Sequence, residues 1–317
     1  MPYYPPQPDD RRKDPPKGHF PFRRALLCFS VLLISYGAVR LIAYGADWLS
    51  SRRTAQEMRD MAAAPEETSG TFPEAIPITD DPAASPAVAS NPAFPAIPQD
   101  AAVPSDILPV VEYPGGLQVN PRIRNLRKKS EYIIGWLTMD DLDEPVTLKD
   151  NSFFLNHDAA GNRNRNGAIF MDEETGLMTR PYTIFLYGHN MKTGAMFGNL
   201  HKYEQPSYCS RHRILQFDTL YEEGQYAVFA VATIRLTPGT AGYVSLDGLN
   251  SNHRKTRQKA LNALLALSVC NSILDVNEED QLLLLITCVG DDNQRLVVAA
   301  RRLRENETPE NLTLNSR

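Results

Sequence analysis

The chain has 317 residues and 24 prolines, and its length permits one or two folded units together with non-globular segments. A formal net charge of -5 and scattered basic residues exclude a nucleic-acid-binding protein that depends on a basic stripe. The four cysteines form no CxxC pair and have no zinc-site spacing, so neither a metal nor a cofactor is predicted.

The N-terminus is predicted to be a cytoplasmic tail, residues 1–24, followed by a transmembrane anchor, residues 25–49. The second segment is apolar and long enough to cross a hydrocarbon core, which takes about 20 helical residues. Arg40 lies toward its C-terminal part, where a long side chain can reach the interface. Arginines before the span predict a single pass with the N-terminus inside and the rest of the chain extracellular. A cleaved signal peptide is the alternative, because alanines and Gly45 lie nearby.

Residues 50–108 are predicted to be a disordered linker that holds a domain away from the membrane. The segment begins with a charged stretch that extends the helix briefly. It then becomes rich in proline and alanine and has neither helical nor strand periodicity.

The folded domain is predicted over residues 109–305, before a polar C-terminal tail at 306–317. A short helix and a strand are expected within 117–139. Further apolar or β-branched runs predict strands, and leucines at helical spacing predict an amphipathic helix over 252–270. The predicted strands lie in 145–158, 182–190, 224–237, 280–289 and 294–304. Many strands and few long helices favour a barrel or sandwich with peripheral helices.

The cysteines of this domain are candidates for chemistry. Cys209, Cys270 and Cys288 are an odd number, so at least one is expected to stay a thiol outside the cytoplasm. Cys288 comes where a buried strand ends in a turn, a position that exposes a side chain on a rigid support. An inert buried cysteine is its alternative. Cys270 is predicted to be a core residue on the 252–270 helix, and Cys209 a surface or packing thiol.

A histidine and an arginine occupy matching positions at strand ends. His189 follows the apolar run TIFLY, where an imidazole can transfer a proton to or from a substrate amine. Arg295 begins the strand after Cys288, so the two are expected to face each other on adjacent strands, where a guanidinium can stabilise an oxyanion. A hydrogen-bonded turn histidine, and a surface arginine paired with Asp291 or Asp292, are the alternatives.

Together these motifs resemble the class B sortases of Gram-positive bacteria. The resemblance rests on FFLNHDAAGNRNRNGAIFMD at 153–172, YGHNMKTGAMFGNL at 187–200, and ITC with RLVVAARRL within 286–303. It covers most of the region from 136 to 303, together with the N-terminal anchor. The chain has Ile286 where the family usually has serine, and its turn between Cys288 and Arg295 is short.

The resemblance implies a mainly β fold, a closed sortase barrel of about eight strands with N-terminal helices and a long helix before the cysteine strand. It implies that Cys288 attacks a sorting signal of a secreted protein after threonine and forms a thioester. An amine of the peptidoglycan precursor, or of a pilin subunit, then resolves the thioester.

The resemblance also assigns the site residues. His189 is implied as the general acid and base, and Arg295 as the residue that binds substrate and stabilises the oxyanion. Asn156, Tyr187 and Thr287 match positions that line the active site, and no metal is implied.

Two other functions are compatible with the same residues. A cysteine endopeptidase would resolve the acyl-enzyme with water in place of an amine. A non-catalytic surface adaptor would use the barrel only to bind peptides.

Overall fold

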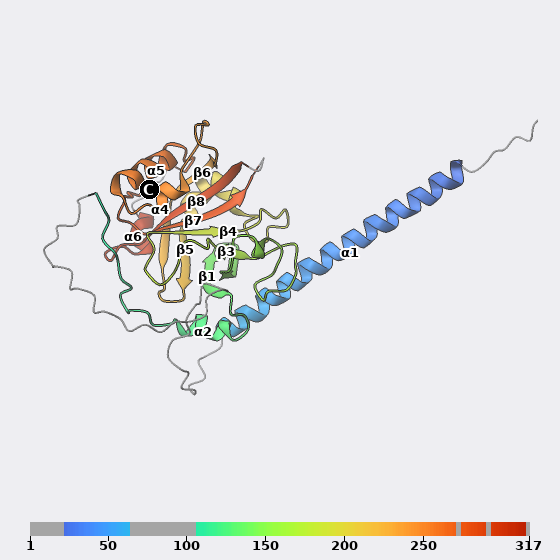
Figure 1. The fold of residues 1–317 in the computed structure, drawn as a ribbon, viewed down its shortest axis with the longest axis horizontal. Coiled ribbons are helices and arrows are strands. Elements are labelled where there is room, and N and C mark those ends of the chain that lie inside the picture. Colours follow the sequence, from blue (N-terminus) through green and yellow to red (C-terminus); the bar gives the residue numbers. More distant parts are fainter. Residues whose placement is uncertain (1–21, 64–105, 271–273, 290–292, 315–317) are drawn as a thin grey trace, which may run out of the picture. The chain divides into compact units, whose positions relative to one another are not determined.

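The computed structural model describes residues 22–63, 106–270, 274–289 and 293–314 (Figure 1). The helices are α1 (Phe22–Ala63), α2 (Pro121–Arg127), α3 (Pro206–Arg211), α4 (Leu246–Asn250), α5 (Arg254–Ala266) and α6 (Pro309–Leu314), with 3-10 helices η1 (Phe153–Leu155) and η2 (Leu200–Glu204). The strands are β1 (Ile133–Met139), β2 (Leu142–Thr147), β3 (Ile169–Met171), β4 (Thr183–Tyr187), β5 (Ile214–Thr219), β6 (Gln225–Arg235), β7 (Leu282–Cys288) and β8 (Gln294–Arg302). The chain divides into two compact units, residues 1–46 and 47–317.

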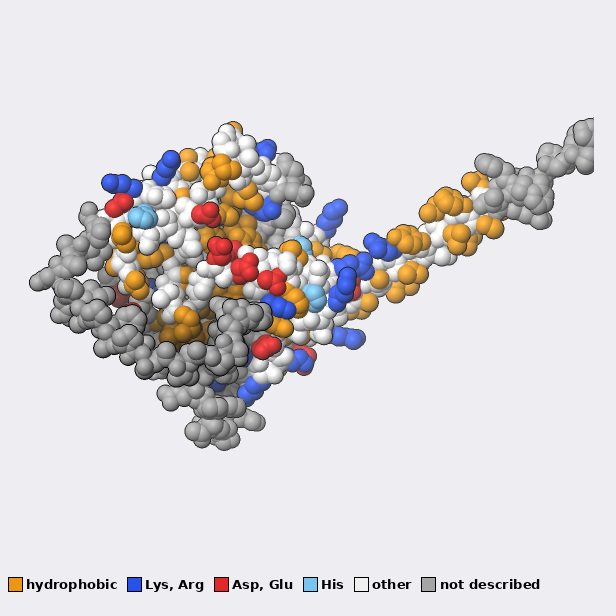
Figure 2. Space-filling view, viewed as in Figure 1, with side chains coloured by type: hydrophobic (Ala, Val, Ile, Leu, Met, Phe, Trp, Pro, Cys, Tyr) orange, Lys and Arg blue, Asp and Glu red, His pale blue; other side chains and the backbone are white. Residues whose placement is uncertain are grey.

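The described part of the first unit is the N-terminal half of α1. Its large apolar side chains are exposed, and Figure 2 shows them along this part of the helix. The stretch that begins at Leu26 is long and apolar enough to cross a membrane. A membrane anchor and a signal sequence both have these properties.

The second unit begins inside the same helix. The segment predicted as a linker from residue 50 was expected to begin with a short helical extension, and α1 continues to Ala63. Ala55 and Met58 are 6% and 0% exposed, because the spacing of three residues places both on the helix face that packs into the core of this unit. The rest of the predicted linker, 64–105, lies outside the described residues.

The second unit contains a closed barrel with the strand order β1-β2-β3-β4-β7-β8-β6-β5. Most neighbours are antiparallel, but β2 pairs with β3 and β4 pairs with β7 in parallel. The predicted sortase-type barrel of about eight strands is confirmed. Two of its strands, β3 and β5, were not predicted, because the first is very short and the second, ILQFDT, carries polar residues on one face.

The central strand β7 is buried on both faces. Leu283 and Leu285 belong to the core inside the barrel. Leu282 and Leu284 belong to a second core, which Leu261 and Leu264 of α5 cover from outside. The apolar run LLLLI is therefore explained by two buried faces, as for a strand between two layers.

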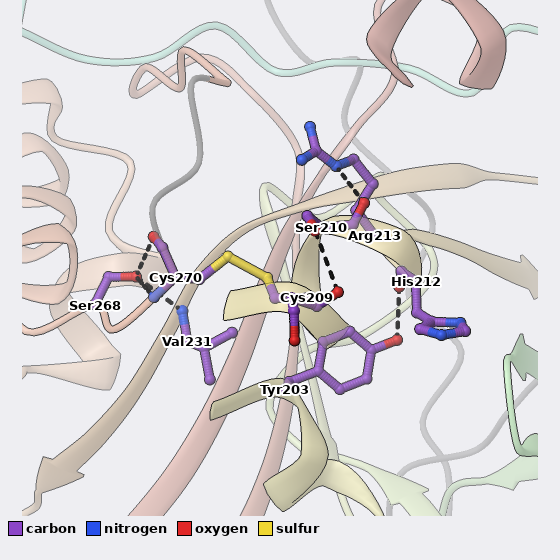
Figure 3. Close-up of a disulfide and its surroundings, with 9 residues drawn as sticks. Tyr203, Cys209, Ser210, His212, Arg213, Val231, Ser268 and Cys270 are labelled. Carbon is purple, nitrogen blue, oxygen red and sulfur yellow. Dashed lines mark hydrogen bonds between the residues drawn. A yellow bond between two sulfur atoms is a disulfide. The ribbon is translucent and has the colours of Figure 1, made fainter. Parts of the chain in front are cut away.

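A disulfide joins Cys209 of α3 to Cys270, which lies beyond the end of α5 (Figure 3). The predictions of two separate thiols were therefore wrong, because the barrel brings together two residues 61 positions apart. Beside Cys270, the Ser268 hydroxyl accepts a hydrogen bond from the Val231 amide of β6 at 3.1 Å. The connection between β6 and β7 is thus fixed covalently and by hydrogen bonds.

We expect Cys209→Ala to lower the free energy of unfolding by about 2–4 kcal/mol, because the bond closes a long loop in the unfolded chain. Thermal unfolding with and without a reductant measures the effect, in a Cys288→Ala background that removes the other thiol of this unit. The reductant should lower the melting temperature of the parent and leave the Cys209→Ala variant unchanged. Equal sensitivity of both proteins would contradict the prediction.

The last turns of α1 carry an ionic contact with the barrel. Arg59 donates hydrogen bonds to the Asp143 carbonyl at 2.8 Å and to Glu144 Oε1 at 2.9 Å. Burial raises the pKa of Glu144 to about 7, and the nearby Arg59 opposes this effect only in part. The folded protein therefore holds a proton on Glu144 that the unfolded chain releases at lower pH.

The raised pKa predicts a stability that declines with rising pH. The contribution of Glu144 is fully present below about 4.5, its ordinary value, and is lost as the pH rises to about 7. Glu144→Gln keeps an oxygen that accepts from Arg59 and removes the titration. We expect this variant to show a flatter decline in melting temperature between these pH values. Glu131→Gln, at an exposed glutamate, is the control, and an unaltered pH dependence in Glu144→Gln would contradict the assignment.

Candidate active site

Three adjacent strand ends meet at one position of the barrel. In the parallel pair β4 and β7, Tyr187 lies opposite Ile286, and the Gly188 amide donates to the Ile286 carbonyl at 3.3 Å. His189 is two residues beyond this last pair on the β4 side, and Cys288 is two residues beyond it on β7. In the antiparallel pair β7 and β8, Cys288 lies opposite Arg295. The barrel therefore brings the backbone positions of the predicted histidine, cysteine and arginine together.

Strand alternation places these positions on one face. Ile286 and Val297 belong to the second core, on the outer face of the barrel. Positions 288 and 295 are each two residues away along their strands, so they fall on the same face. On this face, Arg295 is partly buried.

The imidazole of His189 is held by a backbone carbonyl. Nε2 lies 2.7 Å from the Leu155 oxygen. A carbonyl only accepts hydrogen bonds, so Nε2 carries the hydrogen and the neutral ring keeps its lone pair on Nδ1. The backbone oxygen of His189 accepts from the amides of Met191 and Phe197 at 3.1 and 3.0 Å. Both the ring and its backbone are thereby fixed, with Nδ1 available for proton transfer.

The loop that carries Leu155 passes close to the histidine ring. Gly167 has φ +65°, and a Cβ atom there would lie 2.4 Å from the Phe154 oxygen and 3.1 Å from Cδ2 of His189. Only glycine allows both the left-handed backbone and this close approach. Leu155 and Gly167 were not among the site residues predicted from the sequence, although the NG pair at 166–167 marks a turn.

Two of the predicted lining residues, Thr287 and Tyr187, make contacts within the barrel next to the site. Thr287 is buried, and its hydroxyl donates to the Gly188 oxygen at 2.7 Å, which ties β7 to the start of the histidine segment. Tyr187 is half-buried and packs against Phe170, with ring centroids 5.6 Å apart. Burial and a hydrogen bond to Asp172 raise the pKa of Tyr187, so it stays a neutral phenol.

The other two predicted residues are Arg295 and Asn156. Arg295 donates from Nη1 to the Gln294 oxygen at 2.9 Å, and its charge acts on Tyr187. Asn156 is exposed on the loop next to Leu155, and its backbone oxygen accepts from the Asn164 amide at 2.8 Å. The suggested partners of Arg295, Asp291 and Asp292, lie outside the described residues.

Metal chemistry has no candidate centre in the part of the chain that the structure describes. There, no group of three or more His, Cys, Asp or Glu side chains is arranged to hold an ion. The chemistry that this arrangement can perform is acyl transfer, with a thiol, an imidazole and a guanidinium at neighbouring positions.

Comparison with known proteins identifies the family. The sortase domain model matches residues 145–303. Sortase B of Staphylococcus aureus is 30% identical over 192 residues, which cover 59% of this chain and 76% of the relative. Sortase B of Listeria monocytogenes is 29% identical over 177 residues, which cover 54% and 68%. A crystal structure of a Bacillus anthracis protein similar to sortase B has a TM-score of 0.53 at 31% identity, and the match covers 62% of this chain and 90% of that one.

The chain belongs to the sortase family of cysteine transpeptidases. Its relatives are sortase B proteins, so within that family it falls in class B. The resemblance predicted from the motifs around His189 and Cys288 is confirmed.

The close approach at Gly167 predicts a specific loss of function. Gly167→Ala should lower kcat by roughly tenfold or more, because the new methyl group displaces the loop or the imidazole by a fraction of an ångström. Gly116→Ala is the matched control, since Gly116 also has a positive φ, +68°, but nothing lies within 4 Å of the position that its new methyl group would take. Peptide-transfer kinetics of both variants test this, and similar rates in the two would contradict it.

Proposed function

We propose that Cys288 is the nucleophile, His189 the general acid and base, and Arg295 the oxyanion-stabilising cation of this transpeptidase. The observation that supports the proposal is the strand register: Cys288 of β7 pairs with Arg295 of β8, and β4, which runs parallel to β7, ends two residues before His189. The fixed orientation of the His189 ring supports its role, because Nδ1 is the nitrogen left for proton transfer.

The acylation half-reaction uses all three groups. The Cys288 thiol gives its proton to the neutral imidazole of His189, and the resulting thiolate attacks the carbonyl carbon of the scissile amide. The guanidinium of Arg295 stabilises the negative oxygen of the tetrahedral intermediate. The imidazolium of His189 gives its proton to the leaving nitrogen as the C–N bond breaks. A thioester and a free amine-terminated peptide result.

The second half-reaction reverses these roles. An incoming amine attacks the thioester carbonyl and loses a proton to His189, and the thiolate of Cys288 leaves. The product is a new amide, and the enzyme returns to its starting state. Water in place of the amine would give the endopeptidase.

The substrate class is a sorting-signal peptide that is cleaved after threonine. A solved Staphylococcus aureus sortase B is a substrate complex, 28% identical to this chain with a TM-score of 0.52. Another solved sortase B is complexed with triglycine, a peptide with a free amine. These relatives support a peptide donor and an amine acceptor, which we assign to a surface or pilin protein and to the peptidoglycan precursor.

The three lining residues are proposed to have two different roles. Tyr187 and the exposed Asn156 flank the site and are proposed to contact the peptide. Thr287 gives its hydroxyl to the Gly188 oxygen, so its proposed role is to hold the histidine segment next to β7.

The apolar N-terminal part of α1 is proposed to be a single-pass anchor with a cytoplasmic N-terminus. Its exposed apolar surface and the preceding arginines support this arrangement. The predicted domain boundaries, with the catalytic domain at 109–305, are extended in this proposal to include residues 47–63, which pack into its core.

The test uses the full chain in detergent micelles with a library of threonine-containing sorting peptides, with and without an amine acceptor. Mass spectrometry should detect a thioester adduct on Cys288 and, with the amine, an amide product. Cys288→Ala should form neither, and Arg295→Ala should lower kcat by about 10²–10³-fold. Cys28→Ala, at a cysteine of the N-terminal helix, is the control that keeps activity.

Two results would overturn parts of the proposal. Hydrolysis that is unaffected by any amine would establish the endopeptidase. Peptide binding without an adduct, equal in the wild type and in Cys288→Ala, would establish the adaptor.

A further inference from the structure

The loop between η1 and β3 is a hydrogen-bonded unit that presents one carbonyl to His189. Within it, the Asn164 amide donates to the Asn156 oxygen at 2.8 Å, and the Gly167 amide donates to the Asn164 oxygen at 3.1 Å. The loop closes with the Ala168 amide on the Phe154 oxygen at 3.0 Å. Leu155, whose oxygen holds His189, lies between Phe154 and Asn156, which accept two of these bonds. A shift of the loop therefore moves the acceptor that orients the imidazole.

Asn164 connects this loop to the last part of α1. The residue is only 2% exposed, and its side chain uses both ends. Oδ1 accepts from the Asn166 amide at 2.9 Å, inside the loop. Nδ2 donates to the Asp47 oxygen at 3.1 Å and to the Ser50 hydroxyl at 2.9 Å, on the helix.

The two residues that follow Asn164 also contact the last part of α1. Asn166, 1% exposed, donates from Nδ2 to the Ser51 hydroxyl at 3.0 Å. Arg165 pairs with the Asp47 carboxylate at 2.7 Å. Three consecutive loop residues thus contact one short stretch of helix.

The helix segment is itself anchored to the catalytic unit. Met58 is fully buried in the core, and the Met61 oxygen accepts from Nδ2 of Asn125 at 3.0 Å. Lys129 forms an ion pair with Glu57 at 2.7 Å. The segment 47–63 therefore has a fixed place against the barrel, from which it can hold the loop.

We propose that Asn164 is a positioning residue of the transfer reaction, which links helix segment 47–63 to the loop whose Leu155 carbonyl orients His189. The inference rests on the proposed role of His189 as acid and base. Its consequence is that the chain immediately after the apolar part of α1 belongs to the catalytic apparatus. The helix segment holds the loop, and the loop holds the imidazole.

Asn164→Asp separates the two functions of this side chain. The carboxylate still accepts from the Asn166 amide, but it has no N–H for the Asp47 oxygen, which itself only accepts. The full chain in detergent micelles is assayed for peptide transfer and for the pH profile of Cys288 alkylation by iodoacetamide. We expect kcat to fall about tenfold or more, with KM within about threefold, and the alkylation profile to shift. Asn262→Asp, at an exposed asparagine of α5, should change neither.

A second variant acts only from the helix side. Ser50→Ala with Ser51→Ala removes two hydroxyl acceptors and leaves every loop residue unchanged. We expect kcat to fall by about threefold to tenfold and to recover in the Ser50→Thr, Ser51→Thr protein, which restores both hydroxyls. If Asn164→Asp does not fold, the double alanine and double threonine variants still test whether the helix segment positions the loop.

Wild-type values of kcat and of the alkylation profile in folded Asn164→Asp, or in the double alanine variant, would overturn the inference. The alkylation profile needs no sorting peptide, so it is measured even if no transfer is found. Absence of Cys288-dependent transfer in the wild type would instead overturn the proposed function. The two failures are therefore distinguishable.

Discussion

The register between β4, β7 and β8 is the constraint on which the site depends. Parallel pairing of β4 with β7 ends at Tyr187 and Ile286, two residues before His189 and Cys288, and antiparallel pairing of β7 with β8 sets Arg295 opposite Cys288. Because side chains alternate across a strand, a slip of one residue would move Cys288 to the other face of the barrel. The relative positions of the proposed nucleophile and oxyanion-stabilising residue therefore depend on backbone pairing.

The starts of the two parallel strands are held by a buried arginine. Arg257 of α5 is 0% exposed, and its guanidinium donates to the Tyr182 oxygen before β4 and to the Asp280 oxygen before β7. A buried guanidinium is tolerated only when its N–H groups are satisfied, and here backbone oxygens accept them. Together with the Cys209–Cys270 disulfide, this arginine makes the helical connection between β6 and β7 a brace for the strands that carry the site.

The histidine is supported from a different direction. Its strand ends at Tyr187, so the ring depends on the loop of residues 153–168, and that loop depends on helix segment 47–63. The site is thus held by the barrel on the cysteine and arginine side and by a loop and helix on the histidine side. Residues just after the apolar part of α1 therefore contact the loop whose Leu155 oxygen holds the His189 ring.

The sequence by itself determined the class of fold and the family, because buried strands and short motifs are local patterns, and it supplied Cys288, His189 and Arg295 as candidate site residues. It did not reveal β3 or β5, the packing of the last turns of α1 into the core of the second unit, or the Cys209–Cys270 disulfide. Nor did it reveal the carbonyl of Leu155 as the partner of His189. These features were decided by tertiary structure, since each depends on contacts between residues distant in the chain, and a backbone oxygen leaves no mark in the side-chain pattern.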